Sequence, residues 1–181
     1  MARTFPISAE DLRRVSLGRW LIPILAAMSG EDGSRFGALV RSLGLSRSVL
    51  SNHLGLLETF GWVARNPGHG HPLRPEYLLT AEGRMIAAWS EQAMAQRRRI
   101  GLEPQSLGRW SLPLLFELLD SRRRFSELER GLRPITPRAL TLALDQMLDV
   151  RLVDRRMRDL TPIYGLTPRG NDFAAILQPA R

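Results

Sequence analysis

The sequence predicts a mainly α-helical chain of the α+β class with small β-hairpins, organised as two tandem copies of one unit. The pentapeptide SLGRW occurs at residues 16–20 and recurs at residues 106–110. With a shift of 90 residues (106 minus 16), most of the remaining chain aligns with itself. Each copy passes from helical spacing of apolar residues to short extended runs. Two copies indicate a tandem duplication, because a solenoid needs more repeats to bury a core.

Each copy opens with two helices. The first is apolar and covers about residues 20–28, with its counterpart at about residues 110–119. Pro23 and Pro113 lie at the same place in these helices, about one turn inside, where a kink is expected. A short second helix is expected at residues 36–44, with its counterpart at residues 125–133. We expect three tryptophans in the core: Trp20, Trp62 and Trp110.

The third helix of each copy has the clearest start. Ser46 and Thr136 are good N-cap residues, and Pro137 suits the first helical position. Apolar residues then recur at a spacing of four and three, which predicts one face turned to a core. These residues are Leu50, Leu54 and Leu57 in the first copy and Leu140, Leu144 and Met147 in the second.

Two short extended runs follow the third helix in each copy, and they predict a hairpin. In the first copy they are residues 61–65 and 75–80, and in the second residues 151–155 and 163–167. Residues 66–74 and 156–162 are the predicted loops. Helix, helix, turn, helix and hairpin are the elements of a winged helix-turn-helix domain.

The predicted boundary between the two domains lies near residue 100. Residues 1–100 would form the first winged domain, together with a linking helix over about residues 81–99. Residues 101–181 would form the second. Met85, Trp89 and Met94 lie on the linking helix, which we expect to pack against the second copy.

Composition restricts the possible functions. The net charge is +8, and all 26 basic residues are arginine, so a polyanionic partner is expected, most often nucleic acid. No apolar run is long enough to span a membrane and no signal peptide is evident, which predicts a cytoplasmic, nucleoid-associated protein. Cysteine is absent, and the His69/His71 pair is better explained by a turn than by a metal. We therefore expect no metal, no cofactor, no catalytic residue and no enzymatic activity.

Three motifs occur in the same order in both halves: GRW, RF and Y-x-LT-x-x-G. With the winged helix-turn-helix order of elements, they resemble the HxlR-type bacterial transcription regulators. The resemblance implies binding to double-stranded DNA. Members of that family usually have one winged domain and dimerise through the helix after the wing. A second domain in the same chain leaves open a monomeric pseudo-dimer or a homodimer.

The candidate DNA contacts lie on the third helices and the wings. The N-terminal residues of a recognition helix meet base edges, where arginine pairs with guanine and asparagine with adenine. The outward faces supply Arg47, Ser48, Ser51, Asn52 and His53 in the first copy and Arg138, Thr141 and Leu142 in the second. Arginines flanking the wings are candidates for phosphate contacts: Arg65 and Arg74 at the first wing, and Arg155, Arg156 and Arg158 at the second.

These observations predict a sequence-specific transcriptional regulator. We expect a repressor that acts as a single-chain pseudo-dimer with two unequal DNA-reading heads. The alternative is a tandem winged-helix module for protein interaction, of the kind found in chromosome organisation, with little sequence-specific DNA binding. A small-molecule effector is compatible with either function, but no residue indicates one.

Overall fold

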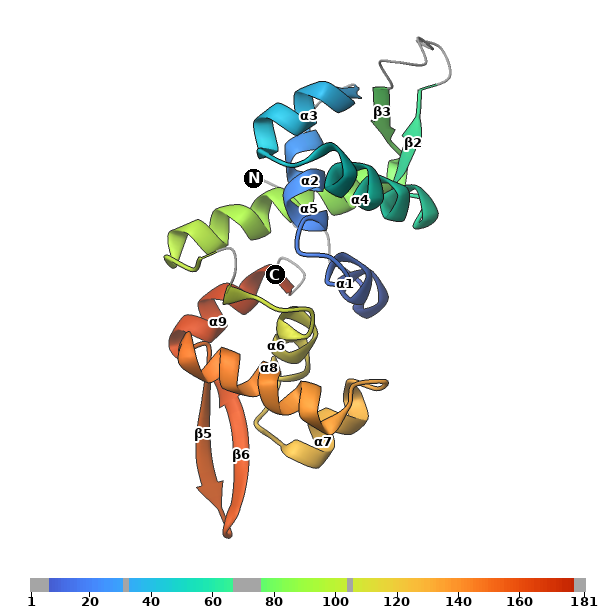
Figure 1. Ribbon diagram of the computed structural model, residues 1–181. Coiled ribbons are helices and arrows are strands. Elements are labelled where there is room, and N and C mark those ends of the chain that lie inside the picture. The colour runs from blue at the N-terminus through green and yellow to red at the C-terminus, as the bar shows by residue number, and fades with distance from the viewer. Residues whose placement is uncertain (1–6, 31–32, 67–75, 104–105, 178–181) are drawn as a thin grey trace. The chain divides into compact units, whose positions relative to one another are not determined.

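The computed structural model describes residues 7–30, 33–66, 76–103 and 106–177 (Figure 1). Contacts divide the chain into two compact units. One unit is Trp20–Met94, and the other joins Met1–Arg19 to Ala95–Arg181. The sequence-based boundary at residue 100 differs from this division mainly at the N-terminus, because the first helix packs with the second copy rather than the first.

The described residues of the unit Trp20–Met94 form three helices, a small antiparallel sheet and the start of a long helix. In chain order the elements are α2 (Leu21–Met28), β1 (Ser34–Arg35), α3 (Phe36–Leu43), α4 (Arg47–Thr59), β2 (Val63–Arg65), β3 (Glu76–Leu79) and α5 (Ala81–Arg99). The strand order is β1-β3-β2, with Arg35 opposite Glu76 and Val63 opposite Leu79.

The second unit repeats this arrangement and adds the first helix. Its elements are α1 (Ala9–Val15), α6 (Ser111–Glu117), β4 (Arg123–Arg124), α7 (Phe125–Gly131), α8 (Pro137–Asp149), β5 (Val153–Arg158), β6 (Thr161–Leu166), α9 (Pro168–Ala174) and a 3-10 turn, Ala175–Leu177. The strand order β4-β6-β5 matches that of the first sheet. The mixed α+β class and the tandem winged helix-turn-helix fold are confirmed. None of the described helices has the length and hydropathy needed to cross a membrane.

The recognition helices α4 and α8 begin as predicted. The Ser46 hydroxyl accepts from the Val49 amide at 3.3 Å, and the Thr136 hydroxyl accepts from the Ala139 amide at 3.3 Å. All six residues of the two apolar stripes are buried, so the opposite faces of α4 and α8 are turned to solvent. Pro23 and Pro113 lie at the third position of α2 and α6, where an amide hydrogen has no partner within the helix and its loss costs little.

Three expectations about the wings and the tryptophans need correction. Residues 156–162 are not a loop, because β5 extends to Arg158 and β6 begins at Thr161. Six residue pairs connect the two strands. The turn is only Asp159 and Leu160, both with positive φ (49° and 60°), as a type I′ turn requires. Trp62 is fully buried, but Trp20 and Trp110 are only half-buried. Short strands β1 and β4, which the sequence did not predict, complete the sheets.

The Y-x-LT-x-x-G motif closes each wing onto the following helix. The Thr80 hydroxyl donates to the Gly61 carbonyl at 2.7 Å and accepts from the Gly83 amide at 3.0 Å. Thr167 does the same between the Arg151 carbonyl (2.7 Å) and the Gly170 amide (2.9 Å). We call each pair a Thr–Gly closure: Thr80 with Gly83, and Thr167 with Gly170.

The glycines of these closures leave no room for a side chain. A Cβ at Gly83 would lie 1.8 Å from the Trp62 carbonyl oxygen, and a Cβ at Gly170 would lie 1.9 Å from the Leu152 carbonyl oxygen. The same carbonyls accept from the amides of Thr80 and Thr167 at 3.0 and 3.1 Å. The motif thus packs the last strand of each wing closely against the helix that follows it.

The helix α1 docks on the second winged domain. It packs against α6, and its Leu12 and Val15 side chains are each 1% exposed. The Arg13 guanidinium donates to the Gly131 carbonyl at 3.2 Å, at the end of α7. The C-terminal end of α5 is also joined to the second copy, because the Gln96 amide group donates to the Asp172 carbonyl of α9. The two copies therefore differ in which outer elements pack on them.

Candidate nucleic-acid interface

The outward face of α4 presents polar side chains to solvent. Arg47, Ser48, Ser51 and Asn52 are all exposed, while the leucine stripe lies on the buried side. The Arg47 guanidinium lies over the Phe36 ring, 5.9 Å from its centroid, so the side chain is partly held at the start of the helix. The Ser48 hydroxyl lies 3.2 Å from the Ser46 hydroxyl. These four side chains could meet base edges and phosphates together.

His53 and Gly55 lie beside this face. His53 is half-buried, and its Nδ1 lies 2.7 Å from the Val49 carbonyl oxygen, so Nδ1 is the donor. A Cβ added to Gly55 would meet no atom of the described residues within 4 Å. Packing therefore does not require glycine at position 55, and the missing side chain leaves room for a partner to approach the helix backbone.

The outward face of α8 differs in its chemistry. Arg138, Thr141 and Leu142 are exposed, Leu142 to 62%. The Thr141 hydroxyl donates to the Pro137 carbonyl at 3.0 Å, so its hydrogen is already used within the helix. Where α4 offers an amide at Asn52, α8 offers an apolar side chain at Leu142. The two helices cannot form the same set of base contacts.

The first wing holds its arginine in a local network. Arg65 is exposed, its Nε lies 3.2 Å from the Glu58 carboxylate, and its guanidinium lies over the Tyr77 ring at 5.9 Å. Burial raises the pKa of the Tyr77 hydroxyl, with Arg65 acting in the opposite direction. A phosphate would compete with Glu58 for Arg65. The other predicted contact of this wing, Arg74, lies outside the described residues.

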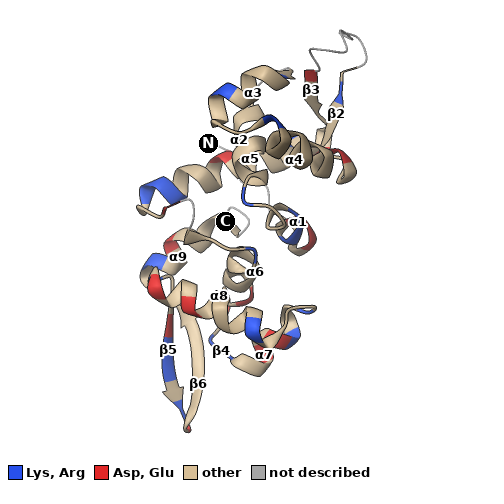
Figure 2. Ribbon diagram, viewed as in Figure 1, with Lys and Arg blue, Asp and Glu red and all other residues tan. Residues whose placement is uncertain are grey.

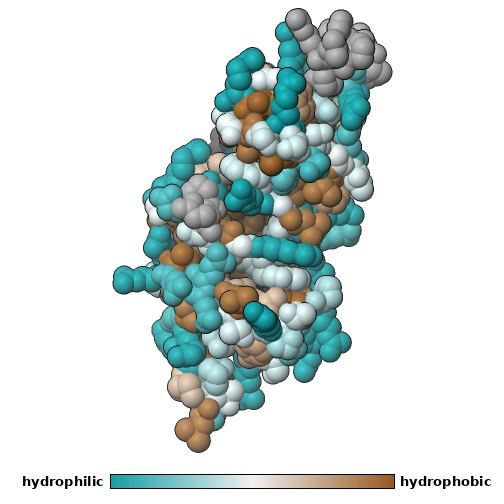
Figure 3. Space-filling model, in the orientation of Figure 1, coloured by the Kyte–Doolittle hydropathy of each residue, from teal (hydrophilic) through white to brown (hydrophobic). Residues whose placement is uncertain are grey.

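The second wing is a long, basic hairpin. Basic residues lie along β5, whereas β6 carries none (Figure 2). Every residue from Arg155 to Leu160 is exposed. Strand alternation places Arg155 on one face of the hairpin and Arg156 and Arg158 on the other. The Arg156 Nε lies 3.3 Å from the Asp154 carboxylate. The tip of the hairpin is hydrophobic (Figure 3), because Leu160 is 94% exposed.

The base of the second wing carries an ion pair that the sequence did not reveal. The Arg122 guanidinium meets the Asp154 carboxylate at 2.5 and 2.9 Å, and the Arg122 side chain lies over Gly165 of β6. Its hydrogen bond with Asp154 raises the pKa of Arg122 and lowers the pKa of Asp154. The partners are 32 residues apart and show no shared periodicity. The pair fixes β5 and so orients the arginines beyond it.

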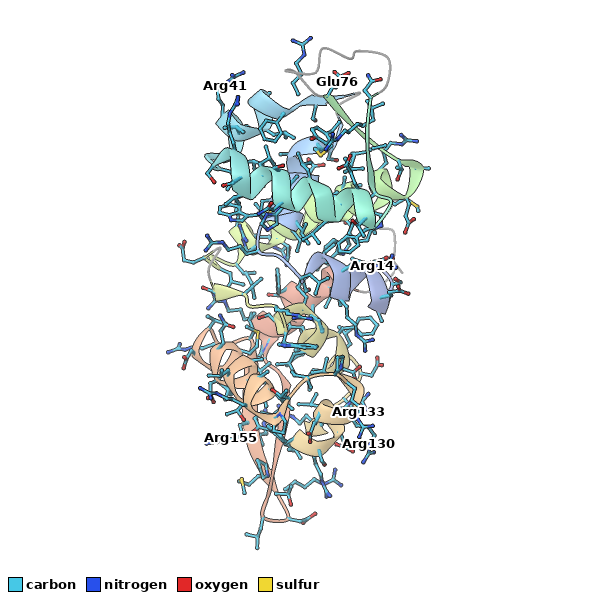
Figure 4. All side chains as sticks on the ribbon, turned by 45° about the vertical axis from the view of Figure 1, so that its right-hand side comes forward. Arg14, Arg41, Glu76, Arg130, Arg133 and Arg155 are labelled. Atoms are coloured by element: carbon cyan, nitrogen blue, oxygen red, sulfur yellow. The ribbon has the colours of Figure 1, made fainter. Side chains whose placement is uncertain are left out.

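Two more arginines missing from the predicted set lie near the turn before α8. Arg130 and Arg133 are exposed at the end of α7, and Figure 4 shows both projecting from this part of the unit. Arg13 of α1 reaches the same place through its bond to Gly131. Across the described ranges, no group of three or more acidic or histidine side chains could hold a metal ion. His69 and His71 fall outside those ranges.

Comparison with known proteins identifies the repeated domain. The HxlR-like helix-turn-helix family matches residues 15–99 and again residues 107–180. An uncharacterised HTH-type transcriptional regulator of Mycobacterium tuberculosis (strain CDC 1551 / Oshkosh) is 42% identical over 71 residues, which are 39% of this chain and 44% of that protein. The uncharacterised HTH-type transcriptional regulator YvaP of Bacillus subtilis (strain 168) is 35% identical over 72 residues, 38% of this chain and 67% of that protein. This chain thus spans less than half the length of the mycobacterial relative. It belongs to the HxlR-like helix-turn-helix family and carries the family's domain twice.

Proposed function

We propose that this chain is a sequence-specific transcriptional repressor that binds double-stranded DNA as a single-chain pseudo-dimer, with two unequal heads. The curated relatives that match it are named as HTH-type transcriptional regulators. Two winged domains, at residues 15–99 and 107–180, could occlude a promoter directly, which is the mode of action we propose. Such a protein acts on the nucleoid, in the cytoplasm.

The observation that carries this proposal is the contrast between the buried and the exposed faces of α4 and α8. The buried stripes and N-caps are alike in both copies. The exposed faces have diverged: Ser51 and Asn52 correspond to Thr141 and Leu142. A homodimer presents two identical heads and favours a palindrome, whereas a duplicated chain can read two different half-sites.

The alternative of a protein-interaction module is less well supported. Such a module has no need of a net charge of +8 or of a wing with three exposed arginines. The polar exposed face of α4 also suits base edges better than it suits an apolar protein surface. We therefore expect this protein to select one DNA sequence from a random pool even when heparin, a polyanion without sequence, competes for it.

Asn52→Ala and Leu142→Ala should have unequal effects on DNA affinity. If Asn52 pairs with adenine, its loss should cost about 1–3 kcal/mol of binding free energy, confined to the half-site under the first domain. Leu142→Ala should cost less, because contact with a thymine methyl discriminates less strongly. The measurement is a titration of each variant against the selected operator and against operators with one half-site scrambled.

Thr59→Ala is the matched control for these variants. Thr59 is exposed on α4 but lies at its C-terminal end, away from the residues expected to meet bases. Its affinity should equal that of the wild type. A symmetric selected site, a stoichiometry of two chains per site, or equal losses for Asn52→Ala and Leu142→Ala would rule out the single-chain reading with unequal heads.

The second wing should dominate the dependence of binding on salt. Each phosphate contact contributes a slope of about −0.9 in the plot of log affinity against log salt. The triple alanine variant of Arg155, Arg156 and Arg158 should have a slope that is flatter by up to about 3. Its affinity should fall by about the same factor for every DNA sequence. The triple lysine variant keeps the charge and should keep the slope. A slope that the alanine variant leaves unchanged would remove this wing from the interface.

A further inference from the structure

The tip of the second wing combines two features that folding alone does not favour. Leu160 is 94% exposed, and its φ is +60°, in the left-handed region that glycine, asparagine and aspartate adopt far more readily than leucine. Type I′ turns usually carry Asn-Gly or Asp-Gly at their two central positions. Asp159 fits that preference, whereas Leu160 occupies the place of the glycine. A large apolar side chain is thus held at the outermost point of the hairpin against both solvation and backbone preference.

The hairpin that carries Leu160 is built as an arm. Six residue pairs, from Val153 opposite Leu166 to Arg158 opposite Thr161, connect its strands, which gives a reach of about 17 Å. Arg122 and Asp154 fix the hairpin at its base. The arm starts at Val153, four residues after α8 ends at Asp149. With α8 in the major groove, about 12 Å wide, an arm of this length extends over one phosphate backbone to the next minor groove.

The charges along the arm distinguish a groove from other apolar partners. Arg155, Arg156 and Arg158 are exposed just behind the tip, where they suit the phosphates that border a minor groove. Asp159, beside Leu160, is unsuited to a phosphate. It is suited to the guanine amino group, which is the one donor that the minor groove presents. These charges therefore favour a position of the tip in the minor groove, between the two DNA phosphate backbones, over a position on either backbone.

We propose, building on the proposed DNA-binding function, that Leu160 is an apolar wedge that enters the minor groove and partly unstacks one base step. Leucine is among the side chains that minor-groove proteins insert in this way, and insertion kinks the duplex. Pyrimidine–purine steps unstack most easily, and a CA/TG step also supplies the guanine amino group for Asp159. The second domain then gains specificity from DNA deformability, in addition to the limited base contacts of α8.

Leu160→Asn tests the wedge directly, because asparagine tolerates the left-handed conformation but lacks the apolar group. The variant should fold as well as the wild type. Its affinity for the selected operator should fall on the order of tenfold, with an unchanged salt slope, because no charge is removed. Energy transfer between dyes on the two DNA ends should report a smaller bend. The base analogue 2-aminopurine at the predicted step should brighten with the wild type and not with the variant.

Met157→Asn is the matched control, since Met157 is 64% exposed on the same hairpin but not at its tip. Its bend and 2-aminopurine signal should match those of the wild type, and Leu160→Phe should retain both. The wedge is overturned if Leu160→Asn binds and bends DNA like the wild type, or if Met157→Asn loses as much. It is also overturned if Leu160→Asn changes only self-association in sedimentation. A wild type that selects no DNA sequence would instead contradict the proposed function itself.

Discussion

Alanine in place of Gly170 should destabilise the second unit by about 1–3 kcal/mol, and by more if the backbone cannot adjust. The new Cβ would lie 1.9 Å from the Leu152 carbonyl oxygen, which already accepts from the Thr167 amide. Because the obstacle is a backbone atom, no side-chain rotation relieves the overlap. Gly83→Ala should behave alike in the first unit, where the overlap is with the Trp62 carbonyl at 1.8 Å. Urea unfolding of each variant measures the loss.

Gly55→Ala provides the control of opposite sign. Gly55 is also a helical glycine, but a Cβ there has open space among the described residues. Alanine should therefore stabilise the protein by about 0.5–1 kcal/mol, since it is the better helix former. If Gly83→Ala and Gly170→Ala proved as stable as Gly55→Ala, the close approach in the Thr–Gly closures would be incorrect.

Leu12→Ala should destabilise the unit that contains α6 by about 2–5 kcal/mol, although residue 12 lies next to the first copy in sequence. Leu12 is 1% exposed, and its helix packs against α6, so truncation leaves a cavity. Native-state hydrogen exchange gives the decisive measurement. Protection should fall in α6 and α8, while α2 and α4 should keep theirs.

Leu17→Ala is the matched control for this variant. Leu17 is 44% exposed just beyond α1, and its truncation should change the free energy of unfolding by less than about 0.5 kcal/mol. A loss of protection in α2 and α4, with α6 and α8 unaffected, would assign α1 to the first copy and contradict the division into units described above.

Sequence reasoning succeeded where the determinants are local. Ser46 and Thr136 are the N-caps of α4 and α8, and the sequence predicted both starts from them. The spacing of the apolar residues after each cap identified the buried face of each helix. It failed where a residue's conformation depends on distant partners. Strands β1 and β4 have two residues each and exist only because β3 and β6 pair with them. The Asp159-Leu160 turn lacks the glycine that usually marks a two-residue hairpin, so the strands appeared shorter than they are.

The candidate interface divides in the same way. Helical spacing correctly predicted that Arg47, Ser51 and Asn52 are exposed to solvent. Their contact with DNA stays a prediction. The networks around the wings were not foreseeable, because they join residues from separate elements. Glu58 holds Arg65, and Arg122 reaches Asp154 across 32 positions of the chain. Such ion pairs leave no periodic trace in a sequence.

The docking of α1 on the second copy sets an order for folding during synthesis. The ribosome makes α1 before its partner α6, which begins at residue 111, 96 residues beyond the end of α1 at residue 15. Translation proceeds at about 5–20 residues per second, so roughly 5–20 seconds pass between the synthesis of Leu12 and Val15 and the synthesis of α6. Residues 20–94 emerge during this interval and can fold meanwhile. The unit that contains α1 and α6 is therefore completed after the unit Trp20–Met94, and a nascent chain that stalls before α6 exposes the apolar face of α1 formed by Leu12 and Val15.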